Sequence, residues 1–215
     1  LVMANQPLAT TLHSGGVEGH EEYVVAMFVD MRGSTSLGER VLAYDVVFIL
    51  NRLFTELSKA LSASNGHYAQ FAGDGLMALY GLDPKRKQFA CGDALAGAAD
   101  MLQRVEKLNQ QLQKEFNESV KIGIGIHGGD AIVGTMGPPS TPLLTAVGDN
   151  INIAARLEAK TKELDCDLIV SIATLDAEDI EYEQDDVDEV DVRGRNNRVQ
   201  VCHLKREQTT RFLAD

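Results

Sequence analysis

Two aspartates stand where apolar runs meet small residues. Asp30 ends the apolar run 24–29 and is followed by the small, hydroxyl-rich segment 33–35, while Asp74 lies between two glycines with apolar residues on both sides. Carboxylates at the ends of core strands suit Mg²⁺, and the N–H groups of a small-residue turn can bind phosphate. A single Asp commonly does no more than end a strand. Together, however, the two indicate a Mg²⁺-dependent site that handles phosphate.

A third polar pair lies further along the chain. Asn152 and Arg156 are four residues apart in a segment with helical spacing, with Ala154 and Ala155 between them. Residues four apart share a face of a helix, so this face would present an amide and a guanidinium group together. The residues alone leave two interpretations open, a solvated surface pair or a set of donors for a ligand.

The composition favours a single domain with an ample core, since 44% of the 215 residues are hydrophobic. The 20 basic and 32 acidic residues give a formal net charge of −12, which argues against nucleic acid as a partner because phosphate backbones require basic surfaces. No apolar run reaches the roughly 18 residues of a membrane span. We therefore expect no membrane contact by this segment.

The cysteines indicate a reducing compartment. Cys91, Cys166 and Cys202 are far apart and lack the CxxC spacing of a zinc site, so buried, reduced thiols are expected, and with them a cytoplasmic location. The sequence begins with Leu1 rather than Met. The chain can therefore be a domain of a longer, even membrane-tethered, protein.

The elements that must position Asp30 begin with a strand. The nearly continuous apolar run 23–30 predicts a central strand covered on both faces. One long helix is expected over 36–63, with Ser36 and Glu39 as its capping box.

A hairpin is expected to position Asp74. Apolar runs at 67–72 and 76–80 flank Gly-Asp-Gly, and Asp-Gly favours tight turns, so Asp74 is expected at the hairpin tip. Helical spacing resumes over 88–117 and predicts a second long helix.

The second half of the chain is expected to alternate between strands, loops and one helix. A strand at 120–127 is expected to turn at Gly128, Gly129 and Asp130 into the short run 131–133, and the Gly- and Pro-rich segment 134–142 predicts a loop or an excursion from the core. The other expected elements are a short apolar run at 143–147, a helix over 150–162, strands at 168–171 and 199–204, and a solvated acidic loop or strand edge at 178–191.

This order of elements predicts an α+β fold with helices packed on one face of a sheet. No internal repeat or internal domain boundary is visible. We expect a flexible or linker segment at 1–22, one domain over 23–205 and a tail at 206–215.

Four motifs in this order resemble the catalytic domain of the class III nucleotidyl cyclases, the adenylyl and guanylyl cyclase family. They are Phe-Val-Asp-Met-Arg-Gly-Ser-Thr, Phe-Ala-Gly-Asp-Gly, Gly-Ile-Gly-Ile-His-Gly-Gly and Gly-Asp-Asn-Ile-Asn-Ile-Ala-Ala-Arg-Leu, and the resemblance covers residues 23–204. It implies a ferredoxin-like βαββαβ domain with an antiparallel-rich sheet. The implied activity is conversion of a nucleoside triphosphate into a 3′,5′-cyclic nucleotide and pyrophosphate.

The resemblance also assigns the metal site. Asp30 and Asp74 match the family's two metal-binding aspartates, and the resemblance implies the backbone carbonyl of Met31 as an additional ligand. Two Mg²⁺ or Mn²⁺ ions are implied. One would lower the pKa of the ribose 3′-hydroxyl, and the other would neutralise the triphosphate.

The remaining substrate contacts are implied in the same way. Asn152 matches the residue that positions the ribose, and Arg156 matches the residue that stabilises charge on the α-phosphate during attack. Backbone N–H groups at the start of the first helix would bind phosphate, and one later basic residue would contact the triphosphate. These residues are Gly33, Ser34, Thr35 and Arg195.

Base selection falls on Gln70 and Thr145, where the sequence departs from the family's common patterns. Adenylyl cyclases commonly have Lys at the first position and Asp or Thr at the second, whereas guanylyl cyclases commonly have Glu and then Cys. A Gln amide can pair with adenine or, flipped, with guanine. We favour ATP, with a guanylyl or pyrimidine cyclase as the alternative.

In this family the active site forms between two domains, so a homodimer with two shared sites is implied, and a monomer should be inactive. Segment 134–142 lies where the family has a dimerisation arm. Another alternative is a catalytically silent nucleotide-binding or regulatory domain. A carboxylate-based phosphodiesterase or nuclease would need more His ligands and a basic groove, and the net charge of −12 disfavours the nuclease.

Overall fold

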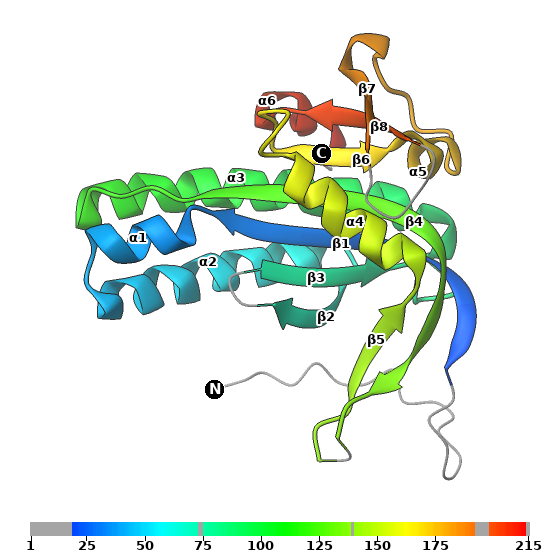
Figure 1. The fold of residues 1–215 in the computed structure, drawn as a ribbon, viewed down its shortest axis with the longest axis horizontal. Helices are drawn as coiled ribbons and strands as arrows, with labels where there is room; N and C mark the ends of the chain where they lie inside the picture. The colour runs from blue at the N-terminus through cyan, green and yellow to red at the C-terminus, as the bar shows by residue number, and fades with distance from the viewer. Residues whose placement is uncertain (1–18, 73–74, 139, 192–197, 214–215) are drawn as a thin grey trace.

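The computed structural model describes residues 19–72, 75–138, 140–191 and 198–213. Its strands are β1 His20–Arg32, β2 His67–Ala72, β3 Gly75–Tyr80, β4 Lys121–Met136, β5 Leu143–Val147, β6 Leu168–Ser171, β7 Val187–Val190 and β8 Val199–Leu204. Its helices are α1 Ser34–Arg40, α2 Ala43–Ala63, α3 Ala90–Phe116, α4 Asp149–Lys160, α5 Ile172–Asp176 and α6 Arg206–Thr209, with 3₁₀ turns at Lys87–Phe89, Gln184–Asp186 and Thr210–Phe212. One mixed sheet connects the strands (Figure 1).

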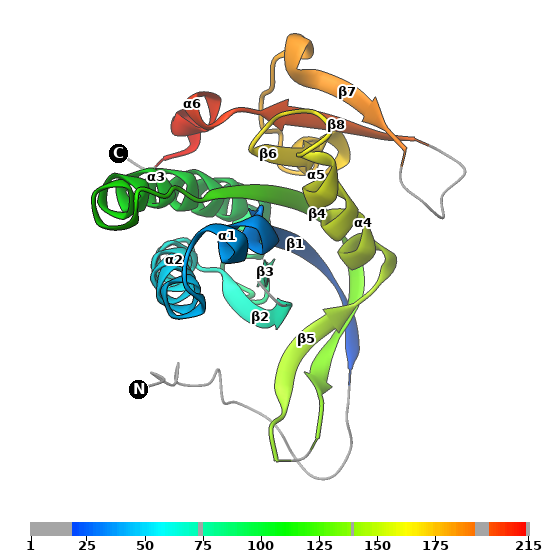
Figure 2. The ribbon, with the colours of Figure 1, turned by 60° about the vertical axis from the view of Figure 1, so that its left-hand side comes forward.

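The sheet is built around β1. Its strand order is β2-β3-β1-β4-β6-β8-β7, and β5 pairs with β4 outside this path. β1 pairs antiparallel with both β3 and β4, whereas β4 pairs parallel with β6. The outer part of β4 and β5 form a hairpin that extends beyond the body of the sheet (Figures 1 and 2).

Alternation along β1 sends its side chains into two different hydrophobic clusters, one on each face of the strand. Val25, Met27 and Val29 belong to the main hydrophobic cluster, to which the buried faces of α2 and α3 contribute. Val24 and Ala26 point to the opposite face and pack with residues of β5 and α4. The predicted α+β cyclase fold is confirmed. The helices expected on one face are α2 and α3, and α4 adds a partial cover on the other.

The single long helix expected over 36–63 is wrong, because it is divided into α1 and α2. Val41 and Leu42 between them are extended. In one continuous helix Leu37 would lie about 160° around the axis from Leu53, at 100° per residue, yet both are buried, at 1% and 0% exposure. Two extended residues reset the helical phase so that both side chains reach the core. The expected capping box is also wrong, since the Ser36 hydroxyl donates to Gly33 O (2.8 Å).

The turn expected at 128–130 is likewise wrong, because β4 continues through it. Gly128 and Gly129 pair with Val25 and Val24 of the long β1 strand. A Cβ on Gly128 would come within 2.2 Å of Tyr23 Oη. Gly128 therefore permits close packing of a β1 side chain, and neither glycine reverses the chain.

Most other expected elements are confirmed. They are the hairpin of β2 and β3, the long helix α3, strand β5, helix α4 and strands β6 and β8. Within the expected loop 134–142, residues 134–136 belong to β4. The acidic segment carries a 3₁₀ turn and the edge strand β7.

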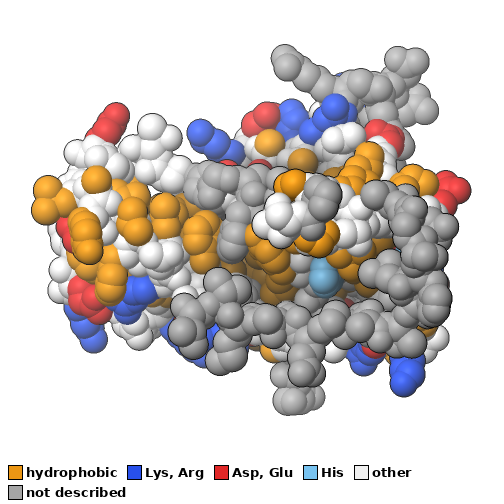
Figure 3. All heavy atoms as spheres, turned by 90° about the horizontal axis from the view of Figure 1, so that it is seen from below, with side chains coloured by type: hydrophobic (Ala, Val, Ile, Leu, Met, Phe, Trp, Pro, Cys, Tyr) orange, Lys and Arg blue, Asp and Glu red, His pale blue; other side chains and the backbone are white. Residues whose placement is uncertain are grey.

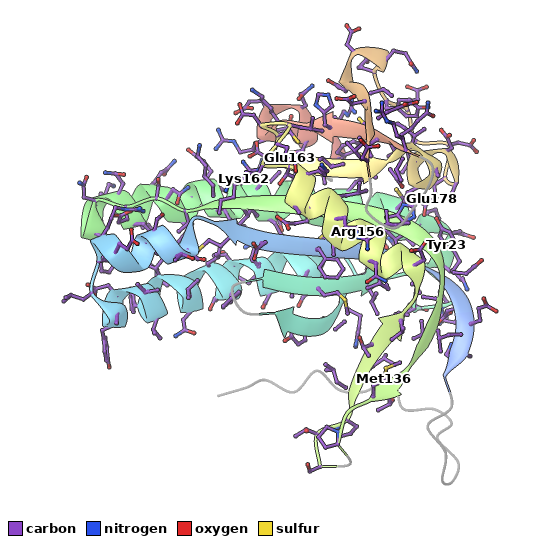
Figure 4. All side chains as sticks on the ribbon, in the orientation of Figure 1. Tyr23, Met136, Arg156, Lys162, Glu163 and Glu178 are labelled. Carbon is purple, nitrogen blue, oxygen red and sulfur yellow. The ribbon has the colours of Figure 1, made fainter. Side chains whose placement is uncertain are left out.

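The acidic segment also caps α3. Glu178 accepts hydrogen bonds from the backbone N–H groups of Cys91 (2.6 Å) and Gly92 (3.0 Å). Glu178 and Tyr23 are labelled near this end of α3 in Figure 4. A carboxylate is favourable at the positive end of a helix, so Glu178 ties the loop before β7 to the main body.

One end of the molecule exposes apolar side chains. Leu42, Tyr44, Val47 and Phe48 are 75%, 87%, 58% and 47% exposed, and Figure 3 shows hydrophobic side chains gathered over this end. Among the described residues, no helix is both long enough and apolar enough to cross a membrane.

Candidate active site

Asp30 lies near the end of β1, half-buried, between two glycines of the neighbouring strands. It pairs with Gly75 of β3 and Gly123 of β4. Alternation along the strand turns its side chain away from the main core, because the Met31 side chain is buried there (4% exposed). On the β4 side the place of a Gly123 side chain is filled by Thr161 and Glu158, whose Oγ1 and Oε1 would lie 2.4 and 2.9 Å from a Cβ there. Asp74 lies outside the described residues, and its chain neighbour Gly75 pairs with Asp30.

The turn after β1 opens directly into α1. Gly33 has φ 72°, a left-handed conformation that suits glycine. Its carbonyl accepts hydrogen bonds from the Leu37 amide (3.0 Å) and the Ser36 hydroxyl (2.8 Å). Within the described part of the chain no side chain caps the start of α1, so its first N–H groups, at Ser34 and Thr35, remain as donors for a ligand.

A row of glycines on β4 positions α4. Cβ atoms on Gly125 and Gly129 would come within 2.2 Å of the Glu158 nitrogen and 2.9 Å of Asn150 Cβ, and one on Gly123 within 2.4 Å of Thr161 Oγ1. The helix therefore packs on the strand at backbone distance. The alternating isoleucines of the same segment, Ile122, Ile124 and Ile126, point into the main core.

Asn152 and Arg156 lie on the opposite side of α4. Asn150, Ala154 and Glu158 form the stripe that contacts β4, and residues two positions away are about 200° around a helix. Asn152 is exposed and Arg156 is half-buried, and Figure 4 shows Arg156 on α4. The two side chains share one face, as predicted. That face is turned away from the sheet that carries Asp30.

The strands of the two expected base-reading residues lie near each other. Thr145 is half-buried on β5 and pairs with Gly134 of β4. Gln70 of β2 pairs with Met77 of β3. β2 and β5 are in contact. The side chain of Gln70 and the whole of Arg195 lie outside the described residues.

Among the described residues, two buried polar atoms have no hydrogen-bond partner, Arg32 Nε and Asn150 Oδ1, and sequence reasoning missed both. Asn150 Nδ2 donates to Gly129 O (2.8 Å) and so fixes the start of α4 to β4. The sequence did contain a pattern that predicts where α4 packs on β4. Glycines at alternate positions before His127 left one face of the strand without side chains.

Of the metal ligands expected from the sequence, those within the described residues are oxygen donors. The Asp30 carboxylate and the Met31 carbonyl suit Mg²⁺ or Mn²⁺. Within the described ranges, no three His, Cys, Asp or Glu side chains converge on one point. The three cysteines are free and buried, and burial raises the pKa of Cys166 and of Cys202 to about 11.

The fold and this arrangement define a nucleotidyl cyclase catalytic domain. Residues 17–211 match the family model described as the adenylate and guanylate cyclase catalytic domain, and the chain belongs to this family.

Similar proteins include both adenylate cyclases and a guanylyl cyclase. Adenylate cyclase 1 of Rhizobium meliloti is 31% identical over 166 residues, which cover 76% of this chain and 24% of that protein. Adenylate cyclase of Anabaena cylindrica is 30% identical over 67% of this chain and 28% of that protein. The crystal structure of the guanylyl cyclase Cya2 has a TM-score of 0.78 and 26% identity, covering 86% of this chain and 92% of that chain. The chain thus spans about a quarter of the length of these two curated relatives.

Proposed function

We propose that this domain converts ATP into 3′,5′-cyclic AMP and pyrophosphate, as a homodimer with two shared active sites. The observation that carries the proposal is that Asp30 and the pair Asn152 and Arg156, the two half-sites, face in opposite directions. Asp30 lies on the sheet, and Asn152 and Arg156 lie on the side of α4 that faces away from it. A helix with its side chains is about 10–12 Å thick. One nucleotide therefore contacts both sets more readily when they come from two copies of the chain.

The metal half-site consists of Asp30, Met31 and Asp74. Their oxygen atoms would hold two Mg²⁺ or Mn²⁺ ions, which when bound lower the pKa of the ribose 3′-hydroxyl and neutralise phosphate charge. The N–H groups of Gly33, Ser34 and Thr35 would orient the triphosphate at the start of α1. Positioning of this kind supplies much of the rate in phosphoryl transfer.

The helical half-site acts on the ribose and the α-phosphate. Asn152 would hold the ribose so that the 3′-oxygen attacks the α-phosphorus in line with the leaving pyrophosphate. Arg156 would donate hydrogen bonds to the α-phosphate oxygens as charge builds up on them. Arg195 would contact the triphosphate.

The β4–β5 hairpin is our candidate for the dimer contact. It extends beyond the body of the sheet, and Ile132 and Val147, paired across it, are 43% and 56% exposed. Exposed apolar side chains that cluster are typical of interaction surfaces. A C2 dimer would give each copy the same contact and create two equivalent sites.

ATP is favoured over GTP by Thr145 and by the adenylate cyclase names of the relatives above. GTP is the second candidate, because the Gln70 amide can pair with either purine and one similar structure is that of a guanylyl cyclase. The domain is proposed to act in the cytoplasm, which suits three free, buried thiols.

The test is a product assay. The purified domain is incubated with each of the four ribonucleoside triphosphates and Mg²⁺ or Mn²⁺, and products are identified by mass spectrometry. We expect cyclic AMP as the main product and none from the Asp30→Ala variant. A demonstrably dimeric sample that cyclises no triphosphate would support the silent-domain alternative instead.

A further inference from the structure

Arg32 connects the end of β1 to the loop that follows α4. It is the last residue of β1, two positions after Asp30 and on the same face of the strand. Its Nη2 donates a hydrogen bond to the carbonyl oxygen of Cys166. β4 lies between β1 and β6 in the sheet. The guanidinium must therefore reach across β4 to make this contact.

The contact leaves another donor unsatisfied. Arg32 Nε is buried and has no hydrogen-bond partner among the described residues, and burying an unpaired N–H group is unfavourable. A side chain whose only role was to fill this space would not need that group. The long Arg32 side chain instead fixes the distance between the end of β1 and Cys166.

The loop that receives Arg32 is firmly joined to α4. The Thr161 hydroxyl donates to Glu158 O (2.6 Å), and the Cys166 amide donates to Thr161 O (3.1 Å). Thr161 also lies against Gly123, the residue paired with Asp30. These hydrogen bonds join Cys166 to the last turn of α4, one turn beyond Arg156.

We propose that Arg32 is a positioning residue that couples the two half-sites within one subunit, the metal-binding end of β1 and the Arg156 face of α4. The proposal rests on the proposed function. In a homodimer with shared sites these two half-sites belong to different active sites, so Arg32 also connects one active site with the other.

The first experiment compares Arg32→Met, which keeps the length of the side chain without its donors, with Arg32→Lys, which keeps one donor. We expect Arg32→Met to lower kcat about 10- to 100-fold with KM changed less than about threefold, and Arg32→Lys to recover part of the loss. Arg40→Met, which removes an exposed arginine paired with Glu118, is the matched control and should keep wild-type kcat. Equal urea midpoints for all variants would exclude a folding defect. A wild-type kcat for Arg32→Met would overturn the proposal.

The second experiment places Arg32→Met in only one subunit of a heterodimer with a single intact site. That site takes its metal half from a subunit carrying Asn152→Ala and its helical half from a subunit carrying Asp30→Ala. Coupling predicts a loss of rate with Arg32→Met in either subunit. A loss in only one arrangement, or in neither, would overturn it.

A readout without catalysis separates this proposal from the proposed function. Hydrogen–deuterium exchange of Arg32→Met should rise both in residues 33–37 and in residues 156–166, and stay unchanged in α3. A rise confined to one segment would refute coupling even if the domain cyclises ATP. Failure of the wild-type domain to make any cyclic nucleotide would refute the proposed function but leave the exchange result valid.

Discussion

Gly125 of β4 lies directly against Glu158 of α4, so closely that a Cβ on Gly125 would come within 2.2 Å of the Glu158 nitrogen. The obstacle is backbone, which cannot rotate away as a side chain can. Gly125→Ala is therefore expected to lower the free energy of unfolding by at least about 1–3 kcal/mol and to displace α4. Urea unfolding monitored by circular dichroism measures the loss.

The control for this prediction is Gly38→Ala in α1. A Cβ on Gly38 meets no atom within 4 Å, and Ala is favoured over Gly inside a helix by about 0.5–1 kcal/mol. Stability equal to or above wild type is expected. If both variants unfold at the wild-type midpoint, the close packing of α4 on β4 is wrong.

His67 should make stability depend on pH. Burial lowers the pKa of this half-buried imidazole on β2 below its usual value of 6.5. The unfolded chain then binds more protons than the folded chain near pH 6, so stability present above pH 6.5 is lost as the pH falls. Urea midpoints at pH 7.5 and 5.5 should differ less for His67→Gln than for wild type. An identical pH dependence of the two proteins would show that His67 is not the group responsible.

Arg156 should act on the chemical step. Because its guanidinium is proposed to stabilise charge that develops during attack, Arg156→Ala is expected to lower kcat about 10²- to 10³-fold with a smaller change in KM. Lys162→Ala removes an exposed cation just beyond α4 (Figure 4) and serves as the control, with kcat unchanged. A large rise in KM at unchanged kcat would show that Arg156 only binds the substrate.

The fold was largely predictable because the apolar periodicity of β1, α3 and the β2–β3 hairpin matches the observed elements. Two features depended on tertiary structure. The interruption at Val41 and Leu42 carries no Gly or Pro and follows from burying Leu37 and Leu53 on the same side. Gly128 and Gly129 resemble a turn locally, but their pairing partners lie more than 100 residues earlier, in β1.

The roles predicted for the site residues stay predictions, but part of their geometry can be compared with the structure. Spacing alone put Asn152 and Arg156 on one face of a helix, and that is confirmed. The spacing could not reveal that this face turns away from Asp30. The direction depends on how α4 packs on β4 at Gly125. The Arg32 contact with Cys166 spans 134 residues of sequence and leaves no local pattern.

Base choice should respond to Gln70 and Thr145. Replacing them with Glu and Cys, the residues common in guanylyl cyclases, is expected to raise the ratio of cyclic GMP to cyclic AMP formed at least about tenfold, because an acceptor would then face guanine N1–H. Product ratios from equal mixtures of ATP and GTP measure the change. An unaltered ratio in an active double variant would move base recognition elsewhere.

The most direct test of the shared site is complementation between two inactive variants. Asp30→Ala and Asn152→Ala are each expected to be inactive alone. Mixed in equal amounts and allowed to exchange subunits, they should regain roughly a quarter of wild-type activity, since half of the dimers are mixed and each has one intact site of two. A mixture that stays inactive, with subunit exchange verified by native mass spectrometry, would contradict the account.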